Sequence, residues 1–162
     1  MLADDDYTQD EIVALDAQTL QPRHRFGLSL FDCARGMVVV GEELFVCDTG
    51  NDRLQVFSLA GEHRRSITGE WKRPETLCLV KDRLYLVEEV DYDEDEEGEF
   101  INPLCGRRIF VLSLQGDTLQ VYTHPVEGQI FESLCCFDGK LLAPVRDRRS
   151  SIAKEVVALC GV

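Results

Sequence analysis

A short apolar motif occurs four times along this chain, and it constrains the fold more than any other feature. The two best-matched copies are RLQVFSL, residues 53–59, and RIFVLSL, residues 108–114. EIVALDA, residues 11–17, and EVVALCG, residues 155–161, follow the same apolar pattern. A recurrence of this kind indicates a repeat architecture, in which each repeat is one unit packed against its neighbours.

Further recurring runs surround these copies. Three first runs occupy residues 34–40, 74–80 and 131–137, and three second runs occupy residues 43–48, 83–88 and 140–145. Short apolar runs bounded by turn residues predict strands, and near-continuous apolarity indicates burial on both faces. More polar runs follow at residues 20–27, 61–69 and 116–124, as expected of outer edge strands. Helical periodicity is absent, so the sequence predicts an all-β fold of four-stranded antiparallel units.

The segment ARGMVVVGEELFVCDTGNDRLQVFSLAGE, residues 34–62, carries a family resemblance. It resembles an NHL repeat, whose pattern runs from proline-glycine through a strand ending in valine-x-aspartate. That pattern continues with threonine-glycine-asparagine, an arginine, and an isoleucine-glutamine-valine-phenylalanine strand. Ala34 and Arg35 depart from the usual start, whereas Pro74 restores the proline in the next copy; the later copies lose the DTGN turn. The resemblance covers residues 10 to 160 and implies a β-propeller.

The predicted strands divide as two, four, four and three. A propeller ring needs at least about four blades, so one chain is not expected to close the ring. The chain is then either a fragment of a longer protein or a half-ring that self-associates. The expected divisions are an acidic N-terminal tail at 1–10, a partial blade at 11–27, blades at 34–69 and 74–124, an acidic insert at 89–107 within the latter, and an incomplete blade at 130–162.

Charge and cysteine content narrow the possible functions. The 162 residues are 44% apolar, enough for a core, and 30 acidic against 17 basic side chains give a net charge of −13. The electric field of this net negative charge repels nucleic-acid phosphates and anionic lipids. No apolar stretch reaches the length of a membrane span. We expect a cytoplasmic protein without membrane contact.

The seven cysteines show no CxxC pair; six are expected to pack in the core, and Cys105 is expected to be exposed.

The candidate binding residues lie in loops that this topology brings to one face. Long loops on a rigid scaffold are where binding residues concentrate. The turn at residues 48–51 has two interpretations: structural, with Gly50 permitting positive φ, or facing a ligand or metal at the ring centre. Trp71 is expected to pack between blades, or, if exposed, to anchor a partner. The full candidate set is Asp48, Asn51, Trp71, Arg73, Arg107, Arg146, Arg148 and Arg149.

The acidic insert contains an incomplete calcium motif. Asp91, Asp93 and Asp95 alternate as at the start of an EF-hand loop. Glu96 stands where that loop needs glycine, and Asn102 where a bidentate glutamate should close the site. We therefore favour a solvated, disordered tract over weak calcium binding, and expect no cofactor. The basic cluster at residues 146–149 is expected to meet this insert through surface pairs worth at most about 1 kcal/mol.

These features favour a protein-interaction or scaffold module that binds a protein partner through loops of one face. Some NHL rings bind single-stranded RNA through a basic face, for which Trp71 would offer a stacking platform, but the net charge disfavours this alternative. A second alternative resembles the gluconolactonase group of metal-dependent hydrolases, with Asp48, Asn51 and Glu88 imitating its ligand set. The histidines are scattered and no nucleophile has a base close in sequence, so we do not expect an enzyme.

Overall fold

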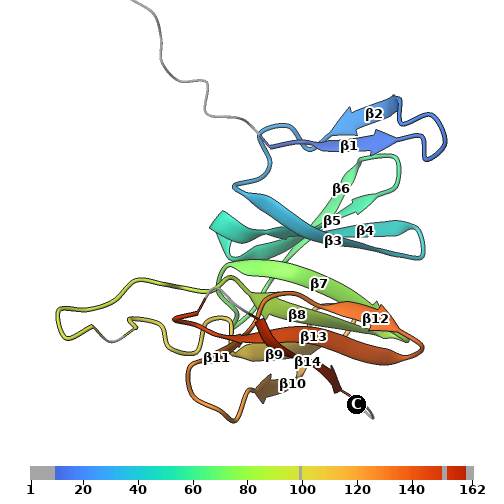
Figure 1. The fold of residues 1–162 in the computed structure, drawn as a ribbon. Coiled ribbons are helices and arrows are strands. Elements are labelled where there is room, and N and C mark those ends of the chain that lie inside the picture. Colours follow the sequence, from blue (N-terminus) through green and yellow to red (C-terminus); the bar gives the residue numbers. More distant parts are fainter. Residues whose placement is uncertain (1–9, 99, 151–152, 160–162) are drawn as a thin grey trace, which may run out of the picture.

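The computed structural model describes residues 10–98, 100–150 and 153–159 (Figure 1). Apart from one 3-10 turn, η1 (Thr49–Asn51), all the regular elements of this part are strands, so the all-β prediction is confirmed. The strands are β1 (Ile12–Leu15), β2 (Pro22–Phe26), β3 (Ala34–Val40), β4 (Glu43–Asp48), β5 (Arg53–Ser58), β6 (His63–Thr68), β7 (Pro74–Val80), β8 (Arg83–Glu88), β9 (Arg108–Leu112), β10 (Thr118–Thr123), β11 (Gln129–Phe131), β12 (Cys135–Phe137), β13 (Lys140–Asp147) and β14 (Ala153–Leu159).

The strands form four antiparallel sheets in chain order. β1 pairs with β2, β3 to β6 form the second sheet, and β7 to β10 form the third. In the fourth sheet, β13 pairs with β14 on one side and with both β11 and β12 on the other. The described strands therefore form a partial propeller that does not close into a ring, as predicted. Closure by self-association stays a prediction.

The first strand of the last sheet is interrupted, which was not predicted from the sequence. Residues 131–137 were expected to be one strand, but β11 ends at Phe131 and β12 begins at Cys135. Pro144 lies opposite the gap in β13, and the backbone N–H of Glu132 donates to its carbonyl at 3.1 Å. Because proline has no backbone N–H, it cannot return a ladder hydrogen bond, and the pairing breaks there.

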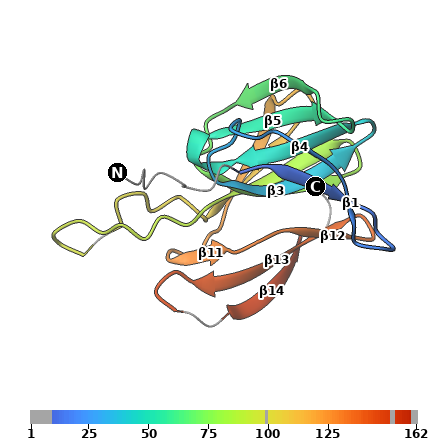
Figure 2. The ribbon, with the colours of Figure 1, turned by 90° about the horizontal axis from the view of Figure 1, so that it is seen from above.

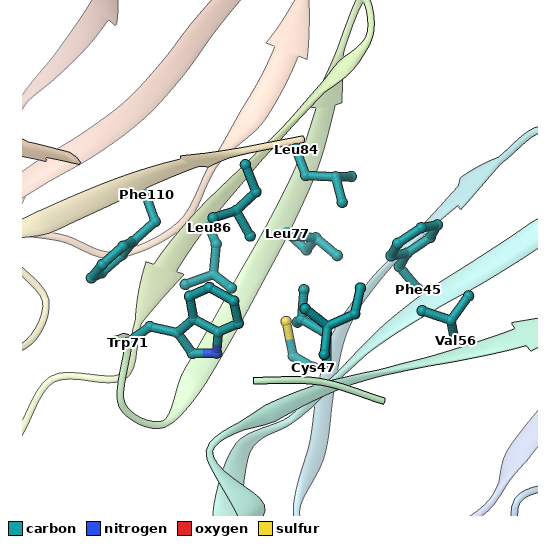
Figure 3. Close-up of a cluster of buried hydrophobic side chains, with 11 residues drawn as sticks. Phe45, Cys47, Val56, Trp71, Leu77, Leu84, Leu86 and Phe110 are labelled. Atoms are coloured by element: carbon teal, nitrogen blue, oxygen red, sulfur yellow. The ribbon is translucent and has the colours of Figure 1, made fainter. Parts of the chain in front are cut away.

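Each pair of neighbouring sheets encloses an apolar layer. Phe57 and Val46 pack towards the β1–β2 sheet, and Val87 and Phe131 belong to the layer between the third and fourth sheets. Figure 1 shows the sheets following one another in chain order, as propeller blades do, and Figure 2 shows β3, β4 and β5 side by side in the second sheet and β13 beside β14 in the fourth. The central layer, between the second and third sheets, is the one drawn in Figure 3; it contains Phe45, Cys47, Leu54, Val56, Ile67, Trp71, Leu77, Leu84, Leu86, Phe110 and Leu112.

Trp71 is the largest side chain of that central layer. Its ring is fully buried and meets Phe110 edge-on, with centroids 6.0 Å apart (Figure 3). A Cβ at Gly69 would overlap the indole, so this glycine makes room for the ring. The prediction that Trp71 packs between blades is confirmed, and the alternative of an exposed anchor is wrong.

The first strands of neighbouring sheets approach closely at Gly36. A Cβ placed there would lie 2.5 Å from the carbonyl oxygen of Glu75 and 2.9 Å from the Cα of Thr76. Only a residue without a side chain therefore lets β3 and β7 run this close together. β3 and β7 are the first strands of their sheets and form the inner edges, at which neighbouring blades come closest.

The cysteines only partly follow the prediction. Cys47 and Cys78 are buried as expected, and Cys160 lies outside the described residues. Cys33 is exposed. Cys135 and Cys136, in β12, are also exposed, because this strand is hydrogen-bonded to a neighbour on one side only. Cys105, expected to be exposed, is buried. No helix in the described part of the chain is long and apolar enough to cross a membrane.

Candidate binding site on the loop face

The turn after β4 is built around the buried carboxylate of Asp48. Its oxygens accept hydrogen bonds from the backbone N–H of Asp32 at 2.7 Å, from Arg53 Nε at 2.7 Å and from Gln55 Nε2 at 3.0 Å. Asn51, although exposed, donates to both oxygens at 3.0 Å. Asp48 has no exposed surface, so the structural interpretation of this turn is confirmed and a role of Asp48 in ligand contact is wrong.

The expected conformation of this turn needs a correction. Asp52, not Gly50, carries the left-handed conformation, with φ of 53°. A Cβ at Gly50 would meet the carboxylate of Asp32, an exposed side chain that can turn away. The Thr49 hydroxyl donates to the carbonyl of Pro74 at 2.6 Å and so ties the turn to the next sheet.

The same corner recurs in the third sheet around Glu88. This carboxylate, fully buried, accepts the backbone N–H of Lys72 at 2.7 Å and two bonds from Arg108, at 2.9 Å from Nε and 2.5 Å from Nη2. Asp32 and Lys72 each stand two residues before a first strand, and Arg53 and Arg108 each begin a third strand. We call this arrangement the carboxylate–arginine corner. Burial raises the pKa of Glu88, against the opposing effect of Arg108.

The corners do not provide the ligand set of the hydrolase alternative. The oxygens of Asp48 and Glu88 already accept hydrogen bonds from arginines, and metal ligation would require breaking them. Across the described residues, no group of three or more histidine, cysteine, aspartate or glutamate side chains could hold a metal ion. The arrangement therefore stabilises the turns.

The acidic insert between β8 and β9 is folded, and the expectation of a disordered tract is wrong. Glu94 forms a β-bridge with Phe100, and the backbone N–H of Ile101 donates to the carbonyl of Asp93 at 2.9 Å. The calcium candidates Asp91, Asp93 and Asp95 do not converge: Asp91 accepts bonds from Asn102 and from the backbone N–H of Asp93, and the side chain of Asp95 accepts one from the backbone N–H of Glu97.

The arginines of the β13–β14 turn hold the insert in place. The Arg146 guanidinium lies 5.7 Å from the centre of the Tyr92 ring and donates to its hydroxyl. Those of Arg148 and Arg149 lie 4.5 Å and 5.1 Å from the centre of the Phe100 ring. The predicted meeting of the basic cluster and the insert is confirmed. Ring faces and backbone carbonyls of the insert make many of these contacts, and the Glu94 carboxylate adds an ion pair with Arg149 at 3.6 Å.

A pocket of about 230 Å³ opens between the insert and the inner strands. Its charged lining comprises Glu75, Glu89, Glu132 and Arg146, and Tyr92 lies at its side. Burial raises the pKa of Glu75; Arg35 opposes this shift, whereas Glu89 and Glu132 add to it. Three of the four charged side chains that line the pocket are carboxylates, so we call it the acidic pocket. Each of them is paired with an arginine: Glu75 with Arg35, Glu89 with Arg35 and Arg73, and Glu132 with Arg146.

This pocket was not predicted from the sequence, although the repeats contained a signal. Arg35 and Glu75 occupy the second position of the first strand in successive repeats, and Glu132 occupies it in the next. In the structure, Arg35 joins Glu75 at 3.0 Å and Glu89 at 2.8 Å. Equivalent positions of blades meet at the inner edge, so aligning the repeats by this position predicts the cluster.

The candidate residues thus lie in four places: two in the scaffold, one at the acidic pocket, one at the turn after β4, and four in or beside the insert. Trp71 and Asp48 are buried and belong to the scaffold, and Trp71 cannot be a surface platform for RNA bases. Arg73 is exposed and pairs with Glu89 at the pocket. Asn51 remains at the surface beside its turn. Arg107, Arg146, Arg148 and Arg149 surround the insert.

Stacked four-stranded antiparallel sheets with apolar layers between them define a β-propeller, and the similar solved structures agree. A chain of the nidogen/laminin complex superposes with a TM-score of 0.63 at 14% identity, covering 93% of this chain and 53% of that one. The WD40 domain of Pan2 from Neurospora crassa gives 0.59 at 8% identity, with 92% and 44% covered. Glutaminyl cyclase from Myxococcus xanthus gives 0.56 at 17% identity, with 82% and 52% covered.

These comparisons establish the fold alone. At such identities, enzymes and non-enzymes share the architecture, and function has to be argued from the site. No protein-family model matches the sequence, and no curated protein does. The chain spans about half the length of the structures that it resembles.

Proposed function

We propose that this chain is an NHL-type interaction module of the cytoplasm, which binds a basic segment of a protein partner through its loop face. The observation that supports the proposal is the folded insert. It presents a continuous run of exposed carboxylates, from Asp93 to Glu97, beside the exposed side chains of Tyr92, Ile101 and Leu104. Aromatic and aliphatic anchors surrounded by charge are typical of a protein-binding surface.

The adjoining acidic pocket suits a lysine or arginine side chain. Glu75, Glu89 and Glu132 supply carboxylates, which the cation of the partner would share with Arg35, Arg73 and Arg146. A basic segment crossing the insert would place one cation in this pocket and the others along the acidic run. The net charge of −13 would also attract such a segment over distance.

The insert is rigid enough to act as a recognition element. Arg146 and Arg149 fix it at both of its aromatic residues, and Arg149 also donates to the carbonyl of Gly98 at 2.7 Å. A surface held in its binding conformation loses less entropy on association than a flexible loop.

A selection from a random peptide library tests this function. The wild-type chain is expected to enrich peptides with lysine or arginine next to apolar residues. The triple variant Glu94→Gln, Glu96→Gln, Glu97→Gln should weaken binding of the selected peptides.

A matched control removes the same charge from the opposite face. Glu42→Gln, Asp82→Asn and Asp138→Asn lie in the turns that join first to second strands, at the far ends of the sheets. This control should retain peptide binding. Selection without enrichment of basic residues, or equal losses in both triple variants, would contradict the proposal.

A further inference from the structure

A second cavity, of about 410 Å³, lies on the other side of the insert. It is bounded by the returning part of the insert, the β10–β11 turn and the β13–β14 turn. Three of its lining side chains are arginines and one is a carboxylate, so its sign is opposite to that of the acidic pocket; the charged residues are Arg107, Glu127, Arg148 and Arg149.

Two of these arginines are held by backbone carbonyls, and Asp91, the acid whose charge acts on Arg148, forms no ion pair with it. Arg107 donates to the carbonyl of His124 at 3.0 Å, and Arg148 donates to the carbonyls of Asn102 and Cys105. Among the described side chains, neither forms an ion pair with a carboxylate. The Nε atoms of both are buried without a hydrogen-bond partner.

A buried arginine without an ion pair is unusual in this molecule. Arg148 is only 3% exposed, whereas the comparably placed Arg108 is bound by Glu88. Acidic residues outnumber basic ones 30 to 17 in the chain. Buried charges in proteins are paired or bind a counter-ion, because an isolated charge is poorly solvated inside a protein. Burial lowers the pKa of Arg148 and the neighbouring Arg107 adds to this effect, whereas the charge of Asp91 opposes it.

The cavity holds its guanidinium groups in fixed positions. Phe100 lies against both Arg148 and Arg149, and the backbone N–H of Arg148 donates to the carbonyl of Gly128 at 2.7 Å. Planar guanidinium groups arranged in this way match the geometry of carboxylate and phosphate oxygens.

We propose that this cavity binds an oxyanion, a phosphate or a carboxylate group, between Arg107 and Arg149 with Arg148 behind them. The site is separate from the acidic pocket and takes ligands of the opposite charge. It therefore does not depend on the proposed binding of a basic partner.

Isothermal titration of the whole chain with inorganic phosphate, and separately with glutarate, tests the proposal. Sodium chloride keeps the ionic strength constant, so that screening does not imitate binding. Saturable binding of one anion per chain is expected, and the preferred anion distinguishes phosphate from carboxylate recognition.

Arg107→Gln and Arg149→Gln should each raise the Kd at least about tenfold, since hydrogen bonds to charged groups are the stronger ones. Arg83→Gln, at the start of β8 and away from the cavity, is the matched control and should leave the Kd unchanged. Circular dichroism of each variant checks that the fold is retained. The proposal is overturned if neither anion gives saturable heat, or if both cavity variants bind with the wild-type Kd.

Discussion

Replacing Glu88 by glutamine should be among the most destabilising single changes in this chain. The substitution keeps the shape of the side chain but removes its charge from the carboxylate–arginine corner. Glu88 has no exposed surface, and the side chain of its partner Arg108 is 20% exposed. The change therefore leaves a largely buried guanidinium without its anion.

The expected loss in the free energy of unfolding follows from the burial of the Glu88–Arg108 pair. Breaking a buried ion pair by removing one partner costs about 3–5 kcal/mol. Water can partly rehydrate Arg108, and burial already raises the pKa of Glu88, so we expect the lower end of this range. With a urea dependence of about 2 kcal/mol per molar, a loss of about 3 kcal/mol lowers the unfolding midpoint by about 1.5 M.

Urea unfolding followed by the fluorescence of Trp71, the single tryptophan, measures this shift. Glu43→Gln is the matched control, because Glu43 pairs with Arg65 at the surface, where the two side chains are 35% and 38% exposed. Such a pair contributes about 1 kcal/mol at most, which corresponds to a midpoint shift of about 0.5 M or less. Equal shifts in the two variants would refute the structural role assigned to the corner.

Three further predictions use the same structure. Gly36→Ala should lower the melting temperature, because the new methyl group would lie 2.5 Å from the backbone carbonyl oxygen of Glu75; an unchanged melting curve would contradict this. In native protein, a maleimide should label Cys135 and Cys136, as mass spectrometry can show, but not Cys105, whose burial raises its pKa to about 11. Burial also raises the pKa of Glu75 above its ordinary value of 4.5, so its ionisation opposes folding at neutral pH and this opposition disappears as pH falls through the raised pKa. Glu75→Gln should therefore melt higher than wild type at neutral pH but not near pH 4, and an equal difference at both would be inconsistent with that sign.

Local patterns predicted most of the strands. The bounds of β3, β4, β7 and β8 coincide with the predicted runs, because turn residues and apolar composition act on neighbouring residues. The interruption before β12 was missed, since it depends on which residue of β13 lies opposite. Pro144 is visible in the sequence, but its effect on the ladder requires the register.

The site was harder to predict because it depends on contacts between repeats. Asp48 and its turn were open to two interpretations, and only the burial of Asp48 decides between them. The basic residues 146–149 were found from their charge alone. Whether a carboxylate pairs with Arg107 or Arg148 depends on how three turns come together in space. Neither the spacing of residues in the sequence nor the composition predicts this.

The close approach of β3 and β7 at Gly36 also bears on the curvature of the assembly. Propeller blades are wedges, and the angle between two neighbours depends on how closely their inner edges approach relative to their outer edges. A side chain at position 36 would separate the inner edges and make these two blades more nearly parallel. A ring built with that smaller angle would need more blades to turn through a full circle, so one missing methyl group helps to set how many blades such a ring can hold.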